Sequence, residues 1–378
     1  MSGIYIHIPF CRQACNYCNF HFTTSLAKKD ALLAAINHEI EMVGTGNSEA
    51  IHTIYLGGGT PSILPAADVA AVLKTVSNHY KIDAHAEITL EANPDDITTE
   101  KLEGWKAAGV NRLSMGVQSF FEEDLKWMNR AHNAFQAKES LALAGSYFNN
   151  ITIDLIYGTP GLTDDKWQQN VATAINYNIP HLSCYALTVE PQTPLDKQIR
   201  RHQKSDVDPD VQSRQFLLLM DWLRQAGYEH YEISNFAKPG SRSRHNTSYW
   251  QGRPYTGIGP SAHSFNGMER RWNISNNQKY IDTINKGGLP FEKEVLTPVQ
   301  KLNEKIMISL RTMEGLGLKA FTDDQKISLL KTAQKYILQG KLIVADNRLQ
   351  LTDTGKLFAD GIAADMFFEE QHEKLKRV

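Results

Sequence analysis

The chain has 378 residues and a formal net charge of −2, with 42% hydrophobic and 22% charged residues. This length suits one large α/β domain with a smaller one, and the composition is that of a soluble globular enzyme. A near-neutral chain without a basic run predicts no nucleic-acid partner. No stretch reaches the roughly 18 apolar residues of a membrane span, and the start MSGIYIHIPF lacks a signal-peptide pattern. We therefore expect a cytoplasmic protein, in which thiols stay reduced.

Six short runs rich in Ile, Leu, Val and Tyr occur in the first half of the chain, as expected of buried parallel strands. They span residues 4–8, 53–56, 87–91, 112–118, 151–157 and 181–187. Amphipathic segments alternate with them, first around residues 33–43 and 69–76 and then over 100–108, 121–130, 137–147 and 164–177. Repeated strand–helix units predict a parallel sheet with right-handed crossovers. Six units favour an α/β fold of the partial (β/α)6, TIM-like barrel type over a complete eight-unit barrel.

The second half of the chain has a different sequence pattern. A helix is predicted over residues 211–226, followed by an irregular stretch from 228 to about 277 that contains HNTSYW and GIGPSAHSF. A loop-rich segment of this length inside a compact chain is usually functional. From residue 298, predicted helices over 300–312, 318–321 and 329–339, a hairpin turning at Asp346-Asn347 and a closing helix indicate a small, helical, winged-helix-like domain. We expect three parts, residues 1–228, 229–297 and 298–378.

Three of the four cysteines, Cys11, Cys15 and Cys18, follow the first predicted strand with the spacing C-x3-C-x2-C. Three thiolates can hold three irons of a [4Fe–4S] cluster and leave the fourth iron open to the amino and carboxylate groups of a small molecule. A structural zinc ion is the alternative, but it needs four ligands, and the sequence offers no second cysteine pair and only His21 nearby. The fourth cysteine, Cys184, lies in an apolar run and is interpreted as a buried structural thiol.

The phrase YIHIPFCRQACNYCNF resembles the radical S-adenosylmethionine (radical SAM) superfamily. Within it, the phrase is similar to the oxygen-independent coproporphyrinogen III oxidase-like family, and in particular to the HemW branch, whose members are regarded as haem chaperones. The resemblance continues through LGGGTPS, EANPD, LSMGVQSF, DLIYGTPG, YALTVEP, HNTSYW and the C-terminal domain, and covers most of the chain. It implies a [4Fe–4S] cluster and S-adenosylmethionine bound at the open iron, where reductive cleavage yields a 5′-deoxyadenosyl radical.

The resemblance also implies a set of residues that bind S-adenosylmethionine. They are Tyr5, Tyr17, Gly58, Gly59, Thr60, Glu91, Gln118, Arg130 and Asp154. Their chemistry suits that role, because glycine admits close backbone approach, carboxylates suit an ammonium group and ribose hydroxyls, and arginine suits a carboxylate. Glu91 and Gln118 are expected at the ends of the third and fourth strands, where barrel sites form, and Asp154 within the fifth. Arg130 is expected in the helix after the fourth strand, and the resemblance places Tyr5 and Tyr17 beside the cluster. Taken singly, the polar residues could cap backbone, the glycines could form a plain turn, and Tyr5 could be a core aromatic.

Two functions remain open. His245 begins the phrase HNTSYW, which resembles a motif associated with haem binding in HemW-type proteins, and a neutral imidazole is a good axial ligand for haem iron. Oxidases of the family carry a fourth motif cysteine, where this chain has Phe20, and a long N-terminal extension that we do not find here. We therefore expect a haem chaperone that passes haem to an unidentified acceptor protein.

The alternative is an oxygen-independent coproporphyrinogen III oxidase, which removes carboxylates from porphyrinogen propionates by radical chemistry. Plainer interpretations are a packed HNTSYW segment with a satisfied His245, and a metal-bearing scaffold without any porphyrin.

Overall fold

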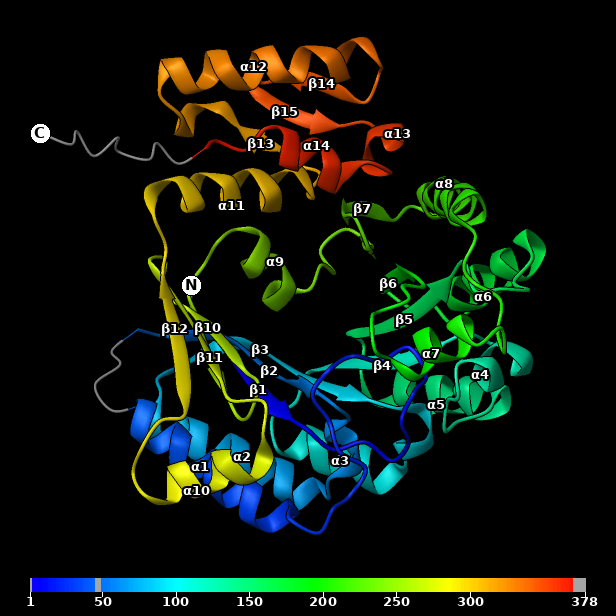
Figure 1. Ribbon diagram of the computed structural model, residues 1–378. Coiled ribbons are helices and arrows are strands. Elements are labelled where there is room, and N and C mark those ends of the chain that lie inside the picture. Colours follow the sequence, from blue (N-terminus) through cyan, green and yellow to red (C-terminus); the bar gives the residue numbers. More distant parts are fainter. Residues whose placement is uncertain (1, 45–48, 370–378) are drawn as a thin grey trace, which may run out of the picture.

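A computed structural model describes residues 2–44 and 49–369 of the chain. Its main part is a curved sheet of twelve strands in the order β12-β11-β10-β9-β1-β2-β3-β4-β5-β6-β8-β7, with helices along one face (Figure 1). The centre of this sheet consists of β1 (Ser2–Ile8), β2 (Ile51–Gly58), β3 (Ile82–Ala92), β4 (Arg112–Gln118), β5 (Ile151–Tyr157) and β6 (His181–Ala186). Neighbouring strands among these six are all parallel. The predicted partial barrel is therefore confirmed.

Each crossover between these strands contains at least one helix. They are α1 (Lys29–Gly44), α2 (Ala66–His79), α3 (Thr99–Ala107), α4 (Glu122–Trp127), α5 (Ala134–Tyr147) and α6 (Asp164–Asn176). The residues just before α3, α5 and α6 explain where these three helices start: the side chains of Thr98, Asn133 and Thr163 each accept a hydrogen bond from a backbone N–H of the first turn.

The two faces of the parallel strands differ in chemistry because side chains alternate along a strand. One set of positions packs with the helices in a single apolar core, among them Ile4, Ile6, Ile8, Leu90, Leu113, Met115, Ile153, Leu155 and Leu182. Cys184 belongs to this core, as predicted. The alternate positions carry Tyr5, Tyr55, Glu91, Arg112, Asp154 and Ser183. A complete TIM barrel fills its interior with branched apolar side chains; here the inner face is polar.

The stretch from 228 to 277, expected to be irregular, is instead ordered into short elements. They are β7 (Glu229–Glu232), β8 (Asn235–Ala237), α9 (Arg244–Trp250), β9 (Tyr255–Ile258), β10 (His263–Phe265) and β11 (Glu269–Asn273). Then α10 (Asn277–Asn285) and β12 (Phe291–Val295) follow. The strand β9 pairs in parallel with β1, and β8 pairs antiparallel with β6. The strands β8 and β9 have only three and four residues and are stabilised by these distant partners, and no local periodicity reveals such pairing.

The predicted helix over 121–130 is too long. The helix α4 ends at Trp127, and Asn129 has the left-handed φ of 58°. A non-glycine residue with positive φ cannot continue a right-handed helix, so Arg130 lies in the loop between α4 and α5. Two more helices follow the sixth strand: α7 (Pro194–Arg200), which was not predicted, and α8 (Pro209–Gln225), which was.

The C-terminal module has its own small core and lies beyond α9 in Figure 1. It consists of α11 (Pro298–Leu310), β13 (Leu316–Gly317), a 3-10 turn (Leu318–Ala320), α12 (Asp323–Leu338), β14 (Leu342–Ala345), β15 (Arg348–Leu351), α13 (Asp353–Lys356) and α14 (Ala359–Asp365). The predicted hairpin turn is present, with φ of 49° at Asp346 and 59° at Asn347, as two-residue hairpin turns of type I′ require. The helix α12 begins earlier than predicted because Thr322 and Gln325 form a capping box.

The division of the chain at residues 228 and 297 stays a prediction, and residues 370–378 of the predicted last part lie outside the described residues. Among the described helices, none combines the length and hydropathy needed to cross a bilayer.

Candidate functional site

The three clustered cysteines lie on the loop between β1 and α1. The backbone N–H of Cys11 donates to the carbonyl of Thr23 at 3.0 Å, and the N–H of Thr23 donates to the carbonyl of Pro9 at 2.9 Å. These bonds close the base of the loop. Cys11, Cys15 and Cys18 are all free and partly buried, so the loop presents three thiols on one segment at the edge of the polar face.

Neighbouring elements clamp the tip of this loop. The N–H of Asn16 donates to the carbonyl of Met128 at 3.2 Å, and the N–H of Leu195 in α7 donates to the carbonyl of Asn16 at 2.9 Å. The side-chain amide of Asn129 donates to the carbonyl of Ala14 at 2.7 Å. The left-handed turn that ends α4 therefore also holds the cysteine loop in place.

Two polar side chains contact the sulfur atoms. The hydroxyl of Thr60 donates to Sγ of Cys11 at 3.5 Å, and Nη1 of Arg130 donates to Sγ of Cys15 at 3.3 Å. Burial raises the pKa of the Cys11 thiol to about 11, against the effect of the Thr60 bond, and burial also raises the pKa of Cys18. These thiols are neutral in the absence of metal, and metal binding would release their protons.

The donor set fits a cluster better than a single ion. Three thiols match the three irons that a cubane cluster can bind through protein thiolates, whereas tetrahedral zinc needs a fourth ligand. His21, the remaining zinc candidate, pairs its Nε2 with the side-chain oxygen of Asn277 at 2.7 Å.

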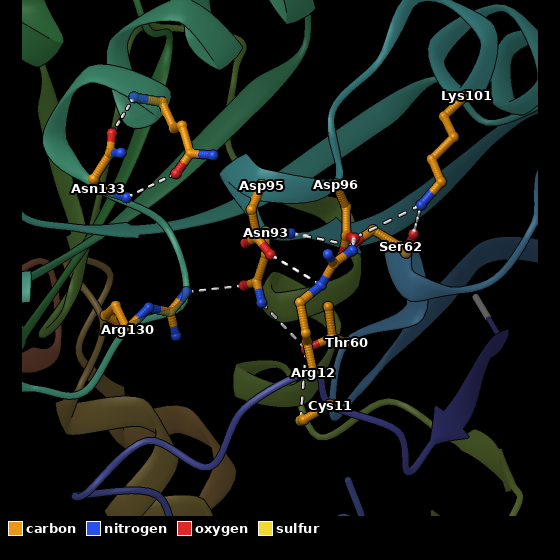
Figure 2. Close-up of polar contacts among 11 residues, drawn as sticks. Cys11, Arg12, Thr60, Ser62, Asn93, Asp95, Asp96, Lys101, Arg130 and Asn133 are labelled. Atoms are coloured by element: carbon orange, nitrogen blue, oxygen red, sulfur yellow. Dashed lines mark hydrogen bonds and ion pairs between the residues drawn. The ribbon is translucent and has the colours of Figure 1, made fainter. Parts of the chain in front are cut away.

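An ion-pair network connects the cysteine loop to the ends of β2 and β3 (Figure 2). The Arg12 guanidinium lies 2.6 Å from Asp96 and 3.2 Å from Asp95, which belong to the 3-10 turn Pro94–Asp96 after β3. The second oxygen of Asp96 accepts from the hydroxyl of Ser62 at 2.7 Å, in the 3-10 turn Pro61–Ile63 after β2. Asp96 is only 2% exposed, so this network fixes the loop on the sheet rather than on the surface.

Arg130 connects the same region to β4. Its Nη2 donates to the side-chain oxygen of Asn93 at 2.8 Å and to the carbonyl of Gly116 at 2.7 Å, and Figure 2 shows the contact with Asn93. The pairing of β4 with β5 shifts between Met115 and Gln118, and Gln118 has the left-handed φ of 69°. The side chains of Gln118 and Arg130 both lie beside Gly116, because a Cβ placed there would lie 3.2 Å from Nε2 of Gln118 and 3.1 Å from Nη2 of Arg130.

Close packing explains the glycine run after β2. A Cβ at Gly58 would lie 2.5 Å from the His7 ring, and Gly58 has φ of +113°. A Cβ at Gly59 would lie 2.6 Å from the carbonyl oxygen of Phe10. No other residue fits at these positions. The glycines therefore let β2 lie against the cysteine loop, and their contact with S-adenosylmethionine stays a prediction.

The two carboxylates of the predicted set share the polar face. Glu91 accepts from the hydroxyl of Tyr55 at 2.8 Å and from the N–H of Gly58 at 3.0 Å. Burial raises the pKa of Glu91 to about 7 and that of Asp154 to about 6, and the charge of Asp154 adds to the rise at Glu91. Carboxylates that are this costly to ionise are suited to receive a cationic group.

The two tyrosines differ in their surroundings. The hydroxyl of Tyr5 lies 3.1 Å from Nδ1 of His7, and its ring lies 6.1 Å from that of Tyr55. Tyr17 packs against a small apolar cluster that includes Leu125 and Met128. Burial raises the pKa of Tyr17, while the charge of Arg130 lowers it. Tyr17 is therefore next to Arg130 and the cysteines, whereas Tyr5 lies beside His7 and Tyr55 on the inner face.

His245 does not lie beside the cysteines. It is 1% exposed, and both ring nitrogens have partners: Nδ1 lies 2.8 Å from the hydroxyl of Thr53, and Nε2 lies 2.7 Å from the hydroxyl of Tyr249. In this conformation His245 offers no nitrogen to a haem iron, because it is satisfied inside the protein. Its role as a haem ligand stays a prediction that requires one of these bonds to open.

The helix α9 closes one end of the polar face. The carboxylate of Glu87 in β3 accepts the backbone N–H groups of Arg244 and His245 at 3.1 and 2.9 Å. The His245 ring stacks on Tyr55 with 5.0 Å between centroids, and Tyr55 in turn donates to Glu91. The HNTSYW segment is therefore linked to the predicted cofactor residues through one tyrosine.

Sequence reasoning missed several residues of the site. Arg12, Asn93 and Asp96 form the network described above. Arg12 lies in the phrase CRQACNYC and Asn93 in the phrase EANPD, whereas Asp96 lies in neither. Arg112 was missed as well: it is 1% exposed, and none of its three guanidinium nitrogens has a hydrogen-bond partner among the described residues. Its charge lowers the pKa of Asp154. Nothing in the sequence indicates that an arginine at the start of a strand, such as Arg112, is buried.

Comparisons with known proteins agree with this architecture. Residues 5–174 match the Radical SAM superfamily, and residues 296–358 match the HemN C-terminal domain. The solved structure of coproporphyrinogen III oxidase (HemN) from Escherichia coli, a radical SAM enzyme, superposes with a TM-score of 0.85 over 97% of this chain and 90% of that chain. At 24% identity this likeness is one of fold.

Curated relatives are closer in sequence. The heme chaperone HemW of Mycobacterium tuberculosis (strain H37Rv) is 34% identical over 95% of this chain and 93% of its own length. The heme chaperone HemW of Bacillus subtilis (strain 168) is 32% identical over 96% of this chain and 98% of its own length. Identity at this level over nearly the whole of both chains establishes membership: this chain belongs to the HemW family of the radical SAM superfamily.

Proposed function

We propose that this chain is a haem chaperone, which holds a [4Fe–4S] cluster with S-adenosylmethionine, takes up haem and passes it to an acceptor protein. The observation that carries the proposal is the full-length similarity to proteins named heme chaperone HemW, at 34% identity over 95% of the chain. The acceptor is a protein still to be identified. Reduced thiols suit a reducing compartment, so we place this activity in the cytoplasm.

The residues on the polar face suit the cofactors. Cys11, Cys15 and Cys18 would hold three irons, and a bound cluster supplies an open iron and an electron for cleavage of S-adenosylmethionine. The remaining predicted ligands would bind the nucleoside: Glu91 and Asp154 suit its ammonium and ribose hydroxyls, and Arg130 suits its carboxylate. Tyr17, beside Arg130, would line the adenine. Tyr5, Gly58, Gly59, Thr60 and Gln118 complete this proposed set.

Phe20 supports a chaperone over an oxidase. It occupies the position of the fourth motif cysteine of the oxidases, two residues after Cys18, and its side chain is 68% exposed. A phenyl ring can neither ligate iron nor exchange protons. The described chain therefore offers three thiols near this loop and no fourth.

Haem loading followed by transfer tests the proposal. The reconstituted protein is titrated with haem under anaerobic conditions, and the Soret band is recorded. We expect a saturable, one-to-one shift, and we expect the loaded protein to convert an apo-haemoprotein to its holo form faster than it loses haem to buffer. A protein that gives no saturable shift, or that never releases haem to an acceptor, is not a haem chaperone.

A further inference from the structure

A groove is lined by residues of α9 and of α11. These two helices lie next to each other where the barrel meets the C-terminal module (Figure 1). The groove has a volume of about 510 Å³, within the size range of cofactor pockets, which often form where two structural units meet. One wall comes from the HNTSYW helix and the segments around it, and the other comes from α11 and the start of the C-terminal sheet. We refer to it as the α9–α11 groove.

Aromatic and aliphatic side chains form much of its lining. Tyr231, Trp250 and Phe265 line the groove on the barrel side, and Ile308 lines it on α11. The guanidinium of Arg311 lies over one face of the Trp250 ring, 5.2 Å from its centre. Such walls favour a flat, largely apolar ligand.

The charges around the groove are unevenly paired. Arg242 pairs with Glu229 at 3.1 Å and with Glu314 at 2.7 Å. Glu304 pairs with Arg270, and Arg348 donates to the carbonyl of Gly315 at 2.9 Å. These groups are therefore satisfied within the protein.

Lys301 and Lys305 are the exception. Both line the groove from α11, and the side-chain ammonium of neither has a hydrogen-bond or ion-pair partner among residues 2–44 and 49–369. Their spacing of four residues places them on the same face of the helix, one turn apart. Two free ammonium groups at one rim suit a ligand with two carboxylates on one edge.

The geometry points to the α9–α11 groove as the binding site for a planar tetrapyrrole dicarboxylate, with Trp250 and Ile308 beside the macrocycle and Lys301 and Lys305 paired with its two propionates. This inference rests on the proposed function and names the site at which it acts. Haem carries two propionates on neighbouring rings, which matches the arrangement of the lysines.

The site differs from a haem site built on His245. That side chain lies on the opposite face of α9, bonded to Thr53 and Tyr249, while Thr247 and Trp250 face the groove. Among the described residues, no histidine or cysteine lines the groove. Binding through the macrocycle face and the propionates, without a strong axial ligand from the groove, suits a carrier that must release its cargo.

Charge reversal tests the site. The double variant Lys301→Glu/Lys305→Glu is compared with the control Lys319→Glu/Lys331→Glu, which makes the same change of charge at two exposed, unpaired lysines of the same module outside the groove. Each protein is titrated with haem, with haem dimethyl ester and with iron-free protoporphyrin IX. Melting curves and iron content verify that each variant is folded and loaded with its cluster.

We expect the groove variant to bind haem about tenfold more weakly than the wild type and the control, as the loss of two exposed ion pairs and their reversal implies. The difference should vanish for the dimethyl ester, and protoporphyrin IX should show the same dependence on the lysines as haem. Groove-variant affinity equal to wild type, or an equal loss in the control, overturns the groove site and leaves the chaperone proposal standing. Failure of the wild type to bind haem overturns both.

Discussion

Nε2 of His245 lies 2.7 Å from the hydroxyl oxygen of Tyr249, one turn later in α9, and Nδ1 lies 2.8 Å from the hydroxyl of Thr53 in β2. The imidazole thus ties the HNTSYW helix to the sheet. Burial, together with the charge of Arg112, lowers the pKa of His245 from its ordinary 6.5 to about 3. The side chain is therefore neutral throughout the physiological range and acts as a structural element in this conformation.

The first prediction concerns stability and pH. Because the folded pKa of His245 is below its unfolded value, the unfolded chain takes up the proton first as pH falls below 6.5. The contribution of this group to the free energy of unfolding is fully present above pH 6.5 and decreases as the pH falls toward 3. At pH 5 the free energy of unfolding has decreased by about 2 kcal/mol because of this group. A His245→Gln variant should be less stable than wild type at pH 7.5 by roughly 1–3 kcal/mol, and this gap should narrow by about 2 kcal/mol at pH 5. Denaturant unfolding at both pH values measures it.

Replacing Tyr249 provides the control for that experiment. Tyr249→Phe removes one partner of the imidazole but no titrating histidine, so its stability gap to wild type should change far less with pH. The same pair of variants tests haem ligation. An unchanged Soret spectrum in His245→Gln excludes His245 as the iron ligand, whereas loss of the band in that variant alone would support it.

The second prediction concerns the cluster. Cys15 is partly buried on the cysteine loop, with its sulfur 3.3 Å from Arg130. Cys15→Ala leaves two thiols of the triplet, so the reconstituted variant should lose most of its iron and acid-labile sulfide. Cys184→Ala is the matched control, because that thiol is buried in the apolar core on the far face of the sheet. Equal iron and sulfide in Cys15→Ala and wild type would contradict the cluster assignment.

The third prediction concerns S-adenosylmethionine. If Glu91 binds its ammonium group as a carboxylate, affinity depends on ionisation of a group with pKa about 7. Wild-type affinity should then fall about tenfold between pH 8 and pH 6, since only about a tenth of the groups are ionised one unit below the pKa. Glu91→Gln should bind weakly at both pH values, with little slope. Calorimetric titration of the cluster-loaded proteins measures this.

Glu100→Gln serves as the control for Glu91, because Glu100 is exposed in the first turn of α3. The affinity of the Glu100→Gln variant for S-adenosylmethionine, and its dependence on pH, should match those of the wild type. A Glu91→Gln protein with the wild-type slope would show that another group controls binding.

The fourth prediction concerns the glycine run. Gly58→Ala places a methyl group 2.5 Å from the His7 ring at φ of +113°, and it should lower the free energy of unfolding by about 3 kcal/mol or more. Gly361→Ala, in α14 with no atom within 4 Å of the new methyl group, should raise stability by roughly 0.5–1 kcal/mol. The melting temperatures of the two variants should therefore shift in opposite directions. A Gly58→Ala variant as stable as the wild type would contradict the explanation of the glycine run by close packing.

Local patterns were sufficient to predict the six-strand core. Runs such as Ile4–Ile8 and Ile151–Tyr157 are continuous in sequence, and their apolar positions alternate with the polar ones that form the inner face. The cysteine loop was equally visible, because its spacing is local. Both results depend on residues close to one another in the chain.

What the sequence did not reveal depends on distant contacts. The strand β9 exists because it pairs with β1, some 250 residues earlier. Arg130 leaves its helix because Asn129 turns left-handed and clamps the cysteine loop. His245 was expected to face a ligand and is buried against Thr53. Lys301 and Lys305 line a groove only because α11 packs near α9.

The chaperone account is tested most directly by an anaerobic reaction of the cluster-loaded protein with reductant, S-adenosylmethionine and coproporphyrinogen III, analysed by mass spectrometry. Intact cluster content is verified in the same sample. We predict that the tetrapyrrole is recovered with all its propionates. Loss of carboxyl groups as CO2 would contradict the account and identify the chain as an oxidase despite Phe20.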